Sequence, residues 1–451
     1  MLSRRNFIKT GTAGTLGLIY AGRSAVAREP SGDITVRVLN PRNRNPVSLI
    51  IDDSTALVNL AYFGIPQFRE VFPDQYPQEW QKLPREIPDD FIREFGNWCG
   101  ENGVKGKFSM VPYPACTGRL DRFIPGWSTQ ALRESLKLVR ELMQPDWDIH
   151  PEMISHTRVI DIKTGVPYPD ATPAFMENWE WSQDKSADEL GSYIAYALNI
   201  LKEAGFSCEG MTTPGGFGGK NMDNLALGTQ QAMKDVFNAD ISHFFRDVIT
   251  DPDKSVEPQM FHIKDLESDH AQVAVHIIGC TNDWFGGWDG LNPGSPDFMI
   301  TPDLQKGRLV DVIGKGEPAI MVCHWPGIYF NGEKHGFNVL KSVVSRLHEK
   351  YNNLLWMKQR EIARYWAAKK LTHISSDRKT VQLNAPFETA LFTISIPGKF
   401  NSISVRHNQN IKNLSRVNDV LSLNKDSFFK DKNETLACFH LPKGISTVQL
   451  Q

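Results

Sequence analysis

An apolar run that ends on two adjacent carboxylates is the feature that most constrains this chain. Residues 48–51 read Ser-Leu-Ile-Ile and lead directly into Asp52 and Asp53. A short apolar run of this kind is typical of a strand that is buried on both faces. Two neighbouring carboxylates repel each other, so a site that keeps both ionised needs a cation or hydrogen-bond donors beside them. The pair could equally cap a following helix, with Ser54 and Thr55 in the turn. The rest of the chain decides between these two interpretations.

The composition is that of a globular protein with a sizeable core. The 451 residues are 41% hydrophobic and 23% charged, and this length allows two or three domains. The net charge of −2 and the lack of a basic run argue against nucleic acid or an anionic membrane surface as the main partner. The six cysteines are far apart and show no Cys-x-x-Cys spacing, which predicts single core residues rather than a zinc cluster.

The first 27 residues are typical of an export signal. Arg4 and Arg5 precede a weakly apolar stretch over residues 10–21, and residues 25–27 (Ala-Val-Ala) offer a small-x-small cleavage site. Paired arginines before such a stretch indicate the twin-arginine export route. The stretch is too short to form a stable membrane span. We therefore expect a protein that leaves the cytoplasm through the twin-arginine export machinery and works in the periplasm or as a secreted protein.

Strand-like and helix-like segments alternate between residues 46 and 371. The apolar, strand-like segments are 48–53, 106–111, 149–157, 208–213, 241–248, 272–278, 319–324 and 354–357. The helix-like segments are 88–101, 128–143, 186–204, 230–237, 302–313, 337–351 and 361–369. Such an alternation predicts βα units with a parallel sheet, and about seven units predict an irregular (β/α)7-type barrel of the α/β class.

The pattern changes from residue 373 onward. Short strand-like segments are separated by Pro, Gly and Asn turns, without a helical period, at 381–383, 391–396, 403–405, 421–423, 437–439 and 447–450. This pattern predicts a small C-terminal β-sandwich, which a strand at residues 34–39 could join. The expected organisation is a signal peptide over residues 1–27, a barrel over 28–371 and a β-sandwich accessory domain over 372–451.

Polar and aromatic side chains gather at the predicted strand ends. In a parallel barrel the carboxyl ends of the strands lie on one rim, where active sites are built. The residues at these ends are Asp52 and Asp53, His156, residues 212–216, Asp283 and Trp284, and His324 and Trp325. A carboxylate and an imidazole can hold a divalent ion, while a second carboxylate and a second imidazole move protons. The rim therefore predicts a metal-assisted hydrolase.

On these residues, the chain resembles the polysaccharide deacetylase family with the NodB-homology fold, over most of residues 46–371. The resemblance implies that Asp52 is the catalytic base and that His324 is the general acid. It implies that Asp53 and His156 are ligands of a divalent metal ion, in the first place zinc.

The resemblance also implies a substrate groove on the same rim. A loop over residues 212–216 would line this groove through Pro214 and Gly215, and Asp283 and Trp284 would form a wall. Trp325, on the rim directly after His324, is a further expected substrate contact.

Two positions depart from the family pattern. The second metal-binding histidine of the family falls at Ile160 here, and the arginine of its groove loop falls at Thr212. A third protein ligand must therefore come from elsewhere. The residues within plausible reach are His150, Asp161, Glu177 and Glu180, and the sequence does not choose among them.

The expected activity is the removal of acetyl groups from a glycan by an exported, metal-dependent enzyme. A glycoside hydrolase on a similar barrel is the first alternative, with Asp52, Glu180 and Asp283 as candidate carboxylates. A glycan-binding relative that has lost the metal and the activity is the second alternative, which Ile160 and Thr212 would permit.

Overall fold

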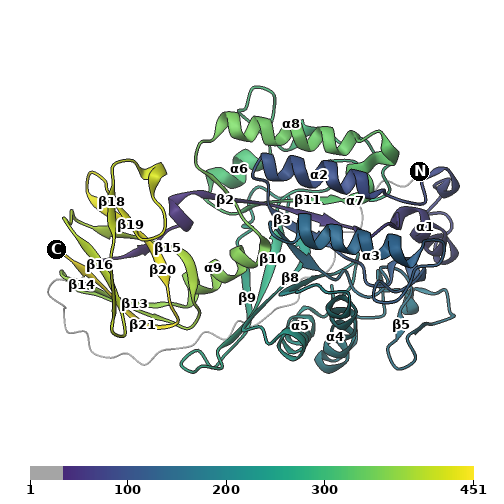
Figure 1. The fold of residues 1–451 in the computed structure, drawn as a ribbon, viewed down its shortest axis with the longest axis horizontal. Coiled ribbons are helices and arrows are strands. Elements are labelled where there is room, and N and C mark those ends of the chain that lie inside the picture. Colours follow the sequence, from purple (N-terminus) through teal and green to yellow (C-terminus); the bar gives the residue numbers. More distant parts are fainter. Residues whose placement is uncertain (1–33) are drawn as a thin grey trace. The chain divides into compact units, whose positions relative to one another are not determined.

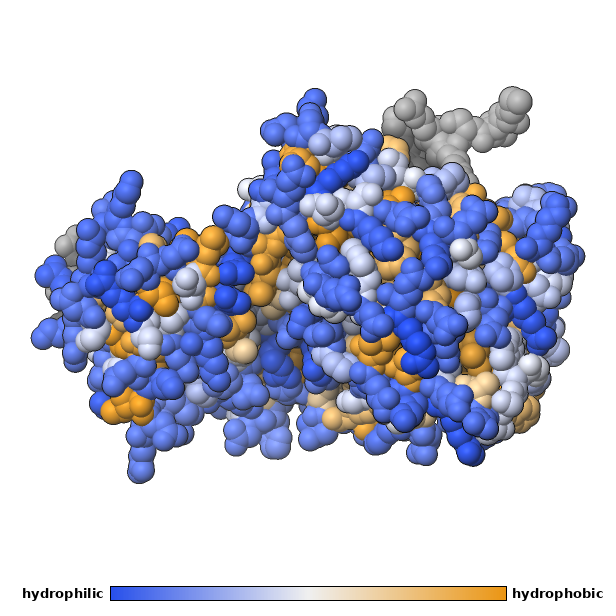
Figure 2. Space-filling model, turned by 45° about the horizontal axis from the view of Figure 1, so that its top comes forward, coloured by the Kyte–Doolittle hydropathy of each residue, from blue (hydrophilic) through white to orange (hydrophobic). Residues whose placement is uncertain are grey.

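The computed structural model describes residues 34–451 (Figure 1). The predicted signal peptide, residues 1–27, lies outside the described residues. Among the described residues, no helix is both long enough and apolar enough to cross a membrane. The face shown in Figure 2 is mostly hydrophilic, and its apolar residues form small, separate groups.

Seven parallel strands build the barrel within residues 34–451. Two sheets contribute them, in the strand orders β11-β2-β3-β4 and β7-β8-β10. Their bounds are β2 (Asn45–Asp52), β3 (Gly106–Ser109), β4 (Trp147–His150), β7 (Gly210–Thr212), β8 (Ile241–Val248), β10 (Gln272–Gly279) and β11 (Ala319–His324). The predicted (β/α)7-type barrel is confirmed.

Backbone pairing between these two sheets is sparse at both of their edges, which makes the barrel irregular. Beyond β4, Glu152 forms a single parallel bridge with Thr212 of β7. On the other side, the Cys280 N–H donates to the Ile320 carbonyl at 2.7 Å and links β10 to β11. The edge of β10 is also covered by the antiparallel strand β9 (Gln259–Lys264), and β12 (Leu354–Trp356) pairs with the start of β2. The short hairpin of β5 (Ile160–Asp161) and β6 (Val166–Pro167) lies outside the barrel sheets.

Helices connect successive barrel strands, and local sequence signals start several of them. Ser128 and Ser186 accept N-cap hydrogen bonds, and Glu189 completes a capping box at the second helix. The helices of the barrel are α1 (Leu60–Val71), α2 (Asp89–Glu101), α3 (Thr129–Leu138), α4 (Ala187–Glu203), α5 (Met222–Phe237), α6 (Arg308–Gly314), α7 (Trp325–Tyr329), α8 (His335–Lys350) and α9 (Gln359–Leu371). Helix α1 has no counterpart among the predicted segments.

The C-terminal residues form two five-stranded sheets that also recruit the start of the described chain. One sheet has the order β1-β15-β20-β19-β18 and the other has the order β13-β14-β21-β16-β17. Their bounds are β1 (Arg37–Val38), β13 (His373–Ser376), β14 (Thr380–Ala385), β15 (Thr389–Pro397), β16 (Ile403–His407), β17 (Asn410–Asn413), β18 (Ser415–Val417), β19 (Ser427–Lys430), β20 (Glu434–Leu441) and β21 (Gly444–Leu450). The predicted strand at 421–423 is wrong, because Val420–Ser422 forms a 3-10 turn whose N-terminal Asp419 accepts the Leu421 N–H.

Candidate active site

A cleft of about 330 Å³ opens at the carboxyl ends of the barrel strands. Asp52 ends β2 and Asp53 follows it directly, while His324 ends β11. Because β2 and β11 pair in parallel with His324 opposite Asp52, the two side chains come from neighbouring strands. His156, from the loop after β4, and His324 both line this cleft together with the two aspartates. Four residues from three distant stretches of the sequence therefore share one cavity.

Asp53, Glu152 and His156 form a compact cluster in the cleft. His156 Nε2 lies 2.7 Å from Asp53 Oδ1 and 3.4 Å from Glu152 Oε1. All three residues are buried. Glu152 is also fixed in place, because its Oε2 accepts the backbone N–H of Asp53 at 2.8 Å. One carboxylate oxygen of Glu152 is thus used to hold the chain, and the other faces the imidazole.

Two of these residues have a left-handed backbone conformation. Asp53 has φ +57° and His156 has φ +65°. Such angles are uncommon outside glycine and are enriched at functional sites, although Asp and His tolerate them better than most residues. The loop of His156 is held by Glu177, whose carboxylate accepts the backbone N–H groups of Ser155 at 3.1 Å and of His156 at 2.6 Å. Glu177 thereby maintains the unusual loop conformation.

The electrostatics of the cluster favour an ionised pair of carboxylates beside a cation. Burial alone would lower the pKa of His156, but the charges of Asp53 and Glu152 raise it well above its usual value. Burial alone would raise the pKa of Glu152, but His156 and Lys107 hold it below its usual value. The cluster therefore carries excess negative charge that attracts a proton or a metal ion.

The donor set fits a divalent metal ion. Asp53 Oδ1 is buried and takes part in no hydrogen bond, although His156 Nε2 is only 2.7 Å away. The carboxylate oxygen and the ring nitrogen therefore face each other across the same small space. Asp53, Glu152 and His156 each offer one ligand atom to such a site, and these atoms lie within 4.8 Å of one another. Two carboxylates and one imidazole match the ligands of zinc and of similar ions.

Asp52 is paired with a lysine inside the barrel. The Lys107 ammonium group donates to Asp52 Oδ1, to the Ile51 carbonyl at 3.2 Å and to Ser109 Oγ at 2.8 Å. Lys107 has no exposed surface, and Asp52 is 4% exposed. Burial raises the pKa of Asp52 to about 6, against the opposing effect of Lys107. Asp52 can therefore exchange a proton near neutral pH, as a general base must.

His324 is oriented by Asp283. His324 Nδ1 lies 2.8 Å from Asp283 Oδ2, which leaves Nε2 free to act in the cleft. Burial alone would lower the pKa of His324, but Asp53, the hydrogen bond to Asp283 and the charge of Asp52 raise it to about 10. A protonated imidazole held in this way can donate a proton to a leaving group. Asp283 itself is not among the residues that line the cleft, and its carboxylate contacts His324; its expected contact with the substrate stays a prediction.

The third member of the cluster, Glu152, is not among the residues that the sequence singled out. Of the four candidates, Glu177 holds the loop backbone, Glu180 is exposed, and Asp161 lies in a separate pocket. His150 faces His243 inside the barrel. The signal for Glu152 was its position four residues before His156, the mirror image of the spacing that the family uses.

Only some of the residues that were expected to contact the substrate line the cleft. Gly215 lines it, and Pro214 is the buried residue directly before. Trp284 packs against Phe298, with ring centroids 5.6 Å apart, and is not in the cleft lining. Trp325 is completely buried, so its expected role in substrate contact is corrected. Trp325 is the first residue of α7, and its side chain points into the core.

The core contacts of Trp325 explain this correction. Its ring packs against Phe91, Phe95 and Phe108 at centroid distances of 4.9, 5.2 and 5.3 Å. Trp325 follows His324 in the sequence, but His324 ends β11 whereas Trp325 begins α7, so the two side chains face different surroundings.

An aromatic wall borders the cleft. Phe68 of α1, Tyr76 and Trp288 line the cavity, and their rings contact one another at centroid distances between 5.2 and 6.0 Å. Trp179 extends the cluster, with its ring 5.5 Å from Phe68. Flat apolar faces of this kind suit the stacking of a sugar ring.

No family model matches the chain, and no curated protein sequence matches it. Among solved structures, the chain is similar to a probable polysaccharide deacetylase from Pseudomonas aeruginosa PAO1, at 11% identity and a TM-score of 0.38, over 72% of this chain and 91% of that chain. It is similar to Puue allantoinase at 11% identity and a TM-score of 0.38, over 73% and 92% of the two chains.

A third similar structure is the catalytic domain of the GH30 xylanase C from Talaromyces cellulolyticus. The identity is 8% and the TM-score is 0.29, over 92% of this chain and 99% of that chain. Identities and TM-scores this low do not assign a function, and the resemblance to the deacetylase family stays a prediction.

Proposed function

We propose that the protein is an exported, metal-dependent carbohydrate deacetylase. One arrangement carries the proposal: Asp52 and His324 end neighbouring strands beside the cluster of Asp53, Glu152 and His156, inside one cleft. A base, an acid and a set of metal ligands around one cavity are the parts that acyl hydrolysis needs.

Each residue has a proposed role in this reaction. Asp53, Glu152 and His156 would hold the divalent ion, which when bound supplies a Lewis acid for the acyl oxygen and lowers the pKa of a water molecule. Asp52 takes the proton of the attacking water, since its pKa of about 6 leaves it ionised at neutral pH. His324 enters protonated and gives its proton to the departing amine or alcohol.

The remaining cleft residues support a sugar-bearing substrate. The cavity of about 330 Å³ has the volume of a small-molecule site and is too small to hold a folded polypeptide. Phe68, Tyr76 and Trp288 offer apolar faces in the same cleft as the proposed acid, base and ligands, and the ring of Phe68 lies 6.4 Å from that of His156. We propose that a sugar ring stacks on the aromatic wall while its acetyl group points to Asp52 and His324.

Acetate release is the direct test. The zinc-loaded protein is incubated with a panel of N- and O-acetylated oligosaccharides, and acetate is measured by an enzyme-coupled assay. We expect release by the wild type and a loss of at least 100-fold in kcat in Asp52→Asn, because general-base catalysis typically contributes about 10²–10⁴-fold. Asp89→Asn, which changes a half-buried aspartate of α2 that bonds Ser135, is the matched control. No acetate from any substrate of the panel would contradict the proposal.

The same reactions separate the two alternatives. New reducing ends without acetate would indicate a glycoside hydrolase. The structure favours this alternative less, because Glu180 is exposed and Asp283 is hydrogen-bonded to His324. Neither of these two candidate carboxylates is therefore free to act as the partner of Asp52. Binding of a glycan without turnover or metal would indicate a binding protein.

Export is part of the proposal and has its own readout. If Arg4 and Arg5 direct the twin-arginine route, replacing both with lysine will leave the full-length protein in the cytoplasmic fraction. Appearance of the processed double variant outside the cytoplasm would contradict this route.

A further inference from the structure

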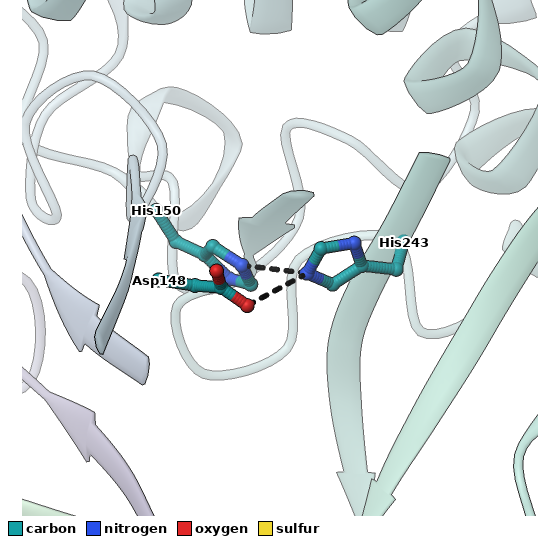
Figure 3. A group of neighbouring side chains, drawn as sticks. All are labelled: Asp148, His150 and His243. Atoms are coloured by element: carbon teal, nitrogen blue, oxygen red, sulfur yellow. Dashed lines mark hydrogen bonds and ion pairs between the residues drawn. The ribbon is translucent and has the colours of Figure 1, made fainter. Parts of the chain in front are cut away.

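A second set of metal-ligand side chains lies inside the barrel, apart from the cleft. Asp148 and His150 point inward from β4 and face His243 of β8 (Figure 3). His150 Nε2 lies 2.9 Å from His243 Nε2, which in turn lies 3.9 Å from Asp148 Oδ2. The two histidines have no exposed surface and Asp148 is 7% exposed. None of the three lines the cleft.

A glycine of β7 provides the space that the imidazole rings of His150 and His243 occupy. Gly210 pairs with His243 in the parallel register between β7 and β8. A Cβ atom at Gly210 would lie 2.4 Å from His243 Nε2 and 2.6 Å from His150 Nε2. Any other residue at this position would push the two imidazoles apart. The strand thus carries a glycine where both ring nitrogens converge.

Neighbouring groups orient the three side chains. Asp148 Oδ2 accepts the backbone N–H of Arg360 at 2.6 Å, and its Oδ1 lies 3.3 Å from Arg360 Nε. His150 Nδ1 lies 3.4 Å from Thr212 Oγ1, which directs the other ring nitrogen toward His243. Metal ligands in proteins are usually oriented by such outer contacts.

His243 is the least satisfied member of the group. Its Nδ1 is buried without a hydrogen-bond partner. Neither imidazole ring is exposed to solvent, and a neutral imidazole offers a nitrogen lone pair to an ion. One ligand atom from each of Asp148, His150 and His243 lies within 4.8 Å of the other two, as ligands of one ion do.

We propose that Asp148, His150 and His243 bind a second divalent transition-metal ion inside the barrel. Two imidazole nitrogens and one carboxylate oxygen suit Zn²⁺ and related first-row ions. Two nitrogens bound to one tetrahedral zinc ion lie roughly 3.3 Å apart, so the imidazoles need to separate by only a few tenths of an ångström. A water molecule or a small shift of a neighbour would complete the coordination.

The position of this ion gives it a structural role. Beyond β4, the contact with β7 is a single bridge between Glu152 and Thr212. An ion held by β4 and β8 spans β7 and closes the barrel where backbone pairing is sparse. Binding energy of a metal that only the folded chain can hold adds to the stability of the fold. The second site does not depend on the proposed deacetylase activity.

Metal content after reconstitution tests the proposal. The full chain is stripped with a chelator, loaded with excess Zn²⁺, desalted and analysed for zinc per chain by mass spectrometry. We expect two zinc ions in the wild type, one in His243→Gln and one in His156→Ala. His276→Gln is the matched control, because His276 is a buried histidine of the adjacent strand β10 outside both groups; it should keep two ions.

The outcomes separate the two sites. One ion in the wild type that His243→Gln keeps and His156→Ala loses would overturn the second site and leave the proposed function standing. One ion that His156→Ala keeps and His243→Gln loses would support the second site and contradict the metal of the cleft. A hydrogen-bonded imidazole pair without metal predicts that His243→Gln leaves the zinc content unchanged.

A second readout covers the case in which His243→Gln folds poorly. In the His156→Ala chain, only the second site remains, so addition of Co²⁺ should give ligand-field absorption and addition of Zn²⁺ should raise the melting temperature. Neither change should occur in the chain that combines His156→Ala with His150→Gln. Equal Co²⁺ spectra in the two chains would overturn the proposal.

Discussion

One buried lysine balances the charge of the proposed base. Lys107 has no exposed surface and donates to Asp52, which is itself buried. Removing one partner of a buried ion pair leaves an uncompensated charge and typically costs about 3–5 kcal/mol. The cation beside Asp52 in this chain is the ammonium group of Lys107, from β3.

We therefore predict that Lys107→Met destabilises the protein and lowers its activity at neutral pH. The unfolding free energy should fall by about 3 kcal/mol or more in urea titrations, and kcat should drop because Asp52 regains a proton. Lys105→Met is the control, because Lys105 is partly exposed and pairs with Asp146. Addition of Asp52→Asn should recover much of the lost stability, and a double variant as unstable as the sum of both single changes would contradict the coupling.

Asp53 and Asp283 both raise the pKa of His324, so loss of the Asp283 charge should shift the pH profile. A general acid must be protonated, so kcat/KM should fall as the pH rises through the pKa of His324. Neighbouring groups, including Asp283, raise this pKa to about 10. Asp283→Asn keeps an oxygen for the loop N–H groups but removes the charge, so the alkaline limb should move to lower pH. An unchanged alkaline limb in pH–rate measurements would rule out His324 as the acid that Asp283 controls.

At the residue scale, the sequence predicts the members of the cleft that sit at strand ends. Asp52, Asp53 and His324 follow unbroken apolar runs, so their place on the rim follows from the barrel. Glu152 was missed although it stands four residues before His156, because it lies inside an apolar segment where the chain leaves β4. Trp325 is the opposite case, because it was predicted to contact the substrate but is buried. Its position next to a rim residue does not determine the direction of its side chain.

The loop between β4 and β5 is the element that assembles the proposed metal ligands. Glu152 and His156 both belong to it, and Glu177 accepts hydrogen bonds from Ile154, Ser155 and His156. Tyr193 of α4 donates to the same carboxylate at 2.6 Å. A single buried carboxylate thus fixes the backbone of the loop.

Loss of this carboxylate should weaken metal binding without touching a ligand. We predict that Glu177→Ala lowers zinc affinity by about 10–100-fold, as loss of outer-shell contacts typically does. The measurement is competition with a chromophoric chelator, with the exposed neighbour Glu180→Ala as control. Wild-type affinity in Glu177→Ala would show that the loop holds its shape without this anchor.

At the element scale, helices with clear periodicity were predictable and helix α1 was not. Residues 60–71 contain Gly64 and Pro66, which local propensity places outside helices. Asn59 caps the helix, and burial of Leu60, Ile65 and Phe68 stabilises it. Tertiary packing therefore overrides local preference at the helix that brings Phe68 to the cleft.

The whole described chain is joined by contacts between α9 and the C-terminal sheets. Tyr365 of α9 donates to the Leu39 carbonyl at 2.7 Å and accepts the Thr393 N–H at 3.2 Å. Ala368 of the same helix belongs to the apolar core of the two sheets. Strand β1, before the barrel, pairs with β15 after it. The two ends of the described chain thus meet in the sandwich.

Because these contacts connect the barrel to the C-terminal sheets, we predict that loss of the Tyr365 hydroxyl lowers the stability of the whole protein. Tyr365→Phe leaves a buried N–H and a buried carbonyl without partners, which costs roughly 1–3 kcal/mol. Thermal unfolding should show one transition at a lower temperature. Tyr351→Phe, at the end of α8, should stay within about 0.5 kcal/mol of the wild type. Two separate transitions in the wild type would contradict the coupling.

The central claim is that Asp53, Glu152 and His156 hold a divalent ion beside Asp52 and His324. Anomalous diffraction at the zinc absorption edge, from a crystal of the zinc-loaded protein, tests it most directly. The account predicts a peak about 2.0–2.2 Å from His156 Nε2 and from one oxygen each of Asp53 and Glu152. A zinc-loaded crystal without a peak between these three side chains would contradict it.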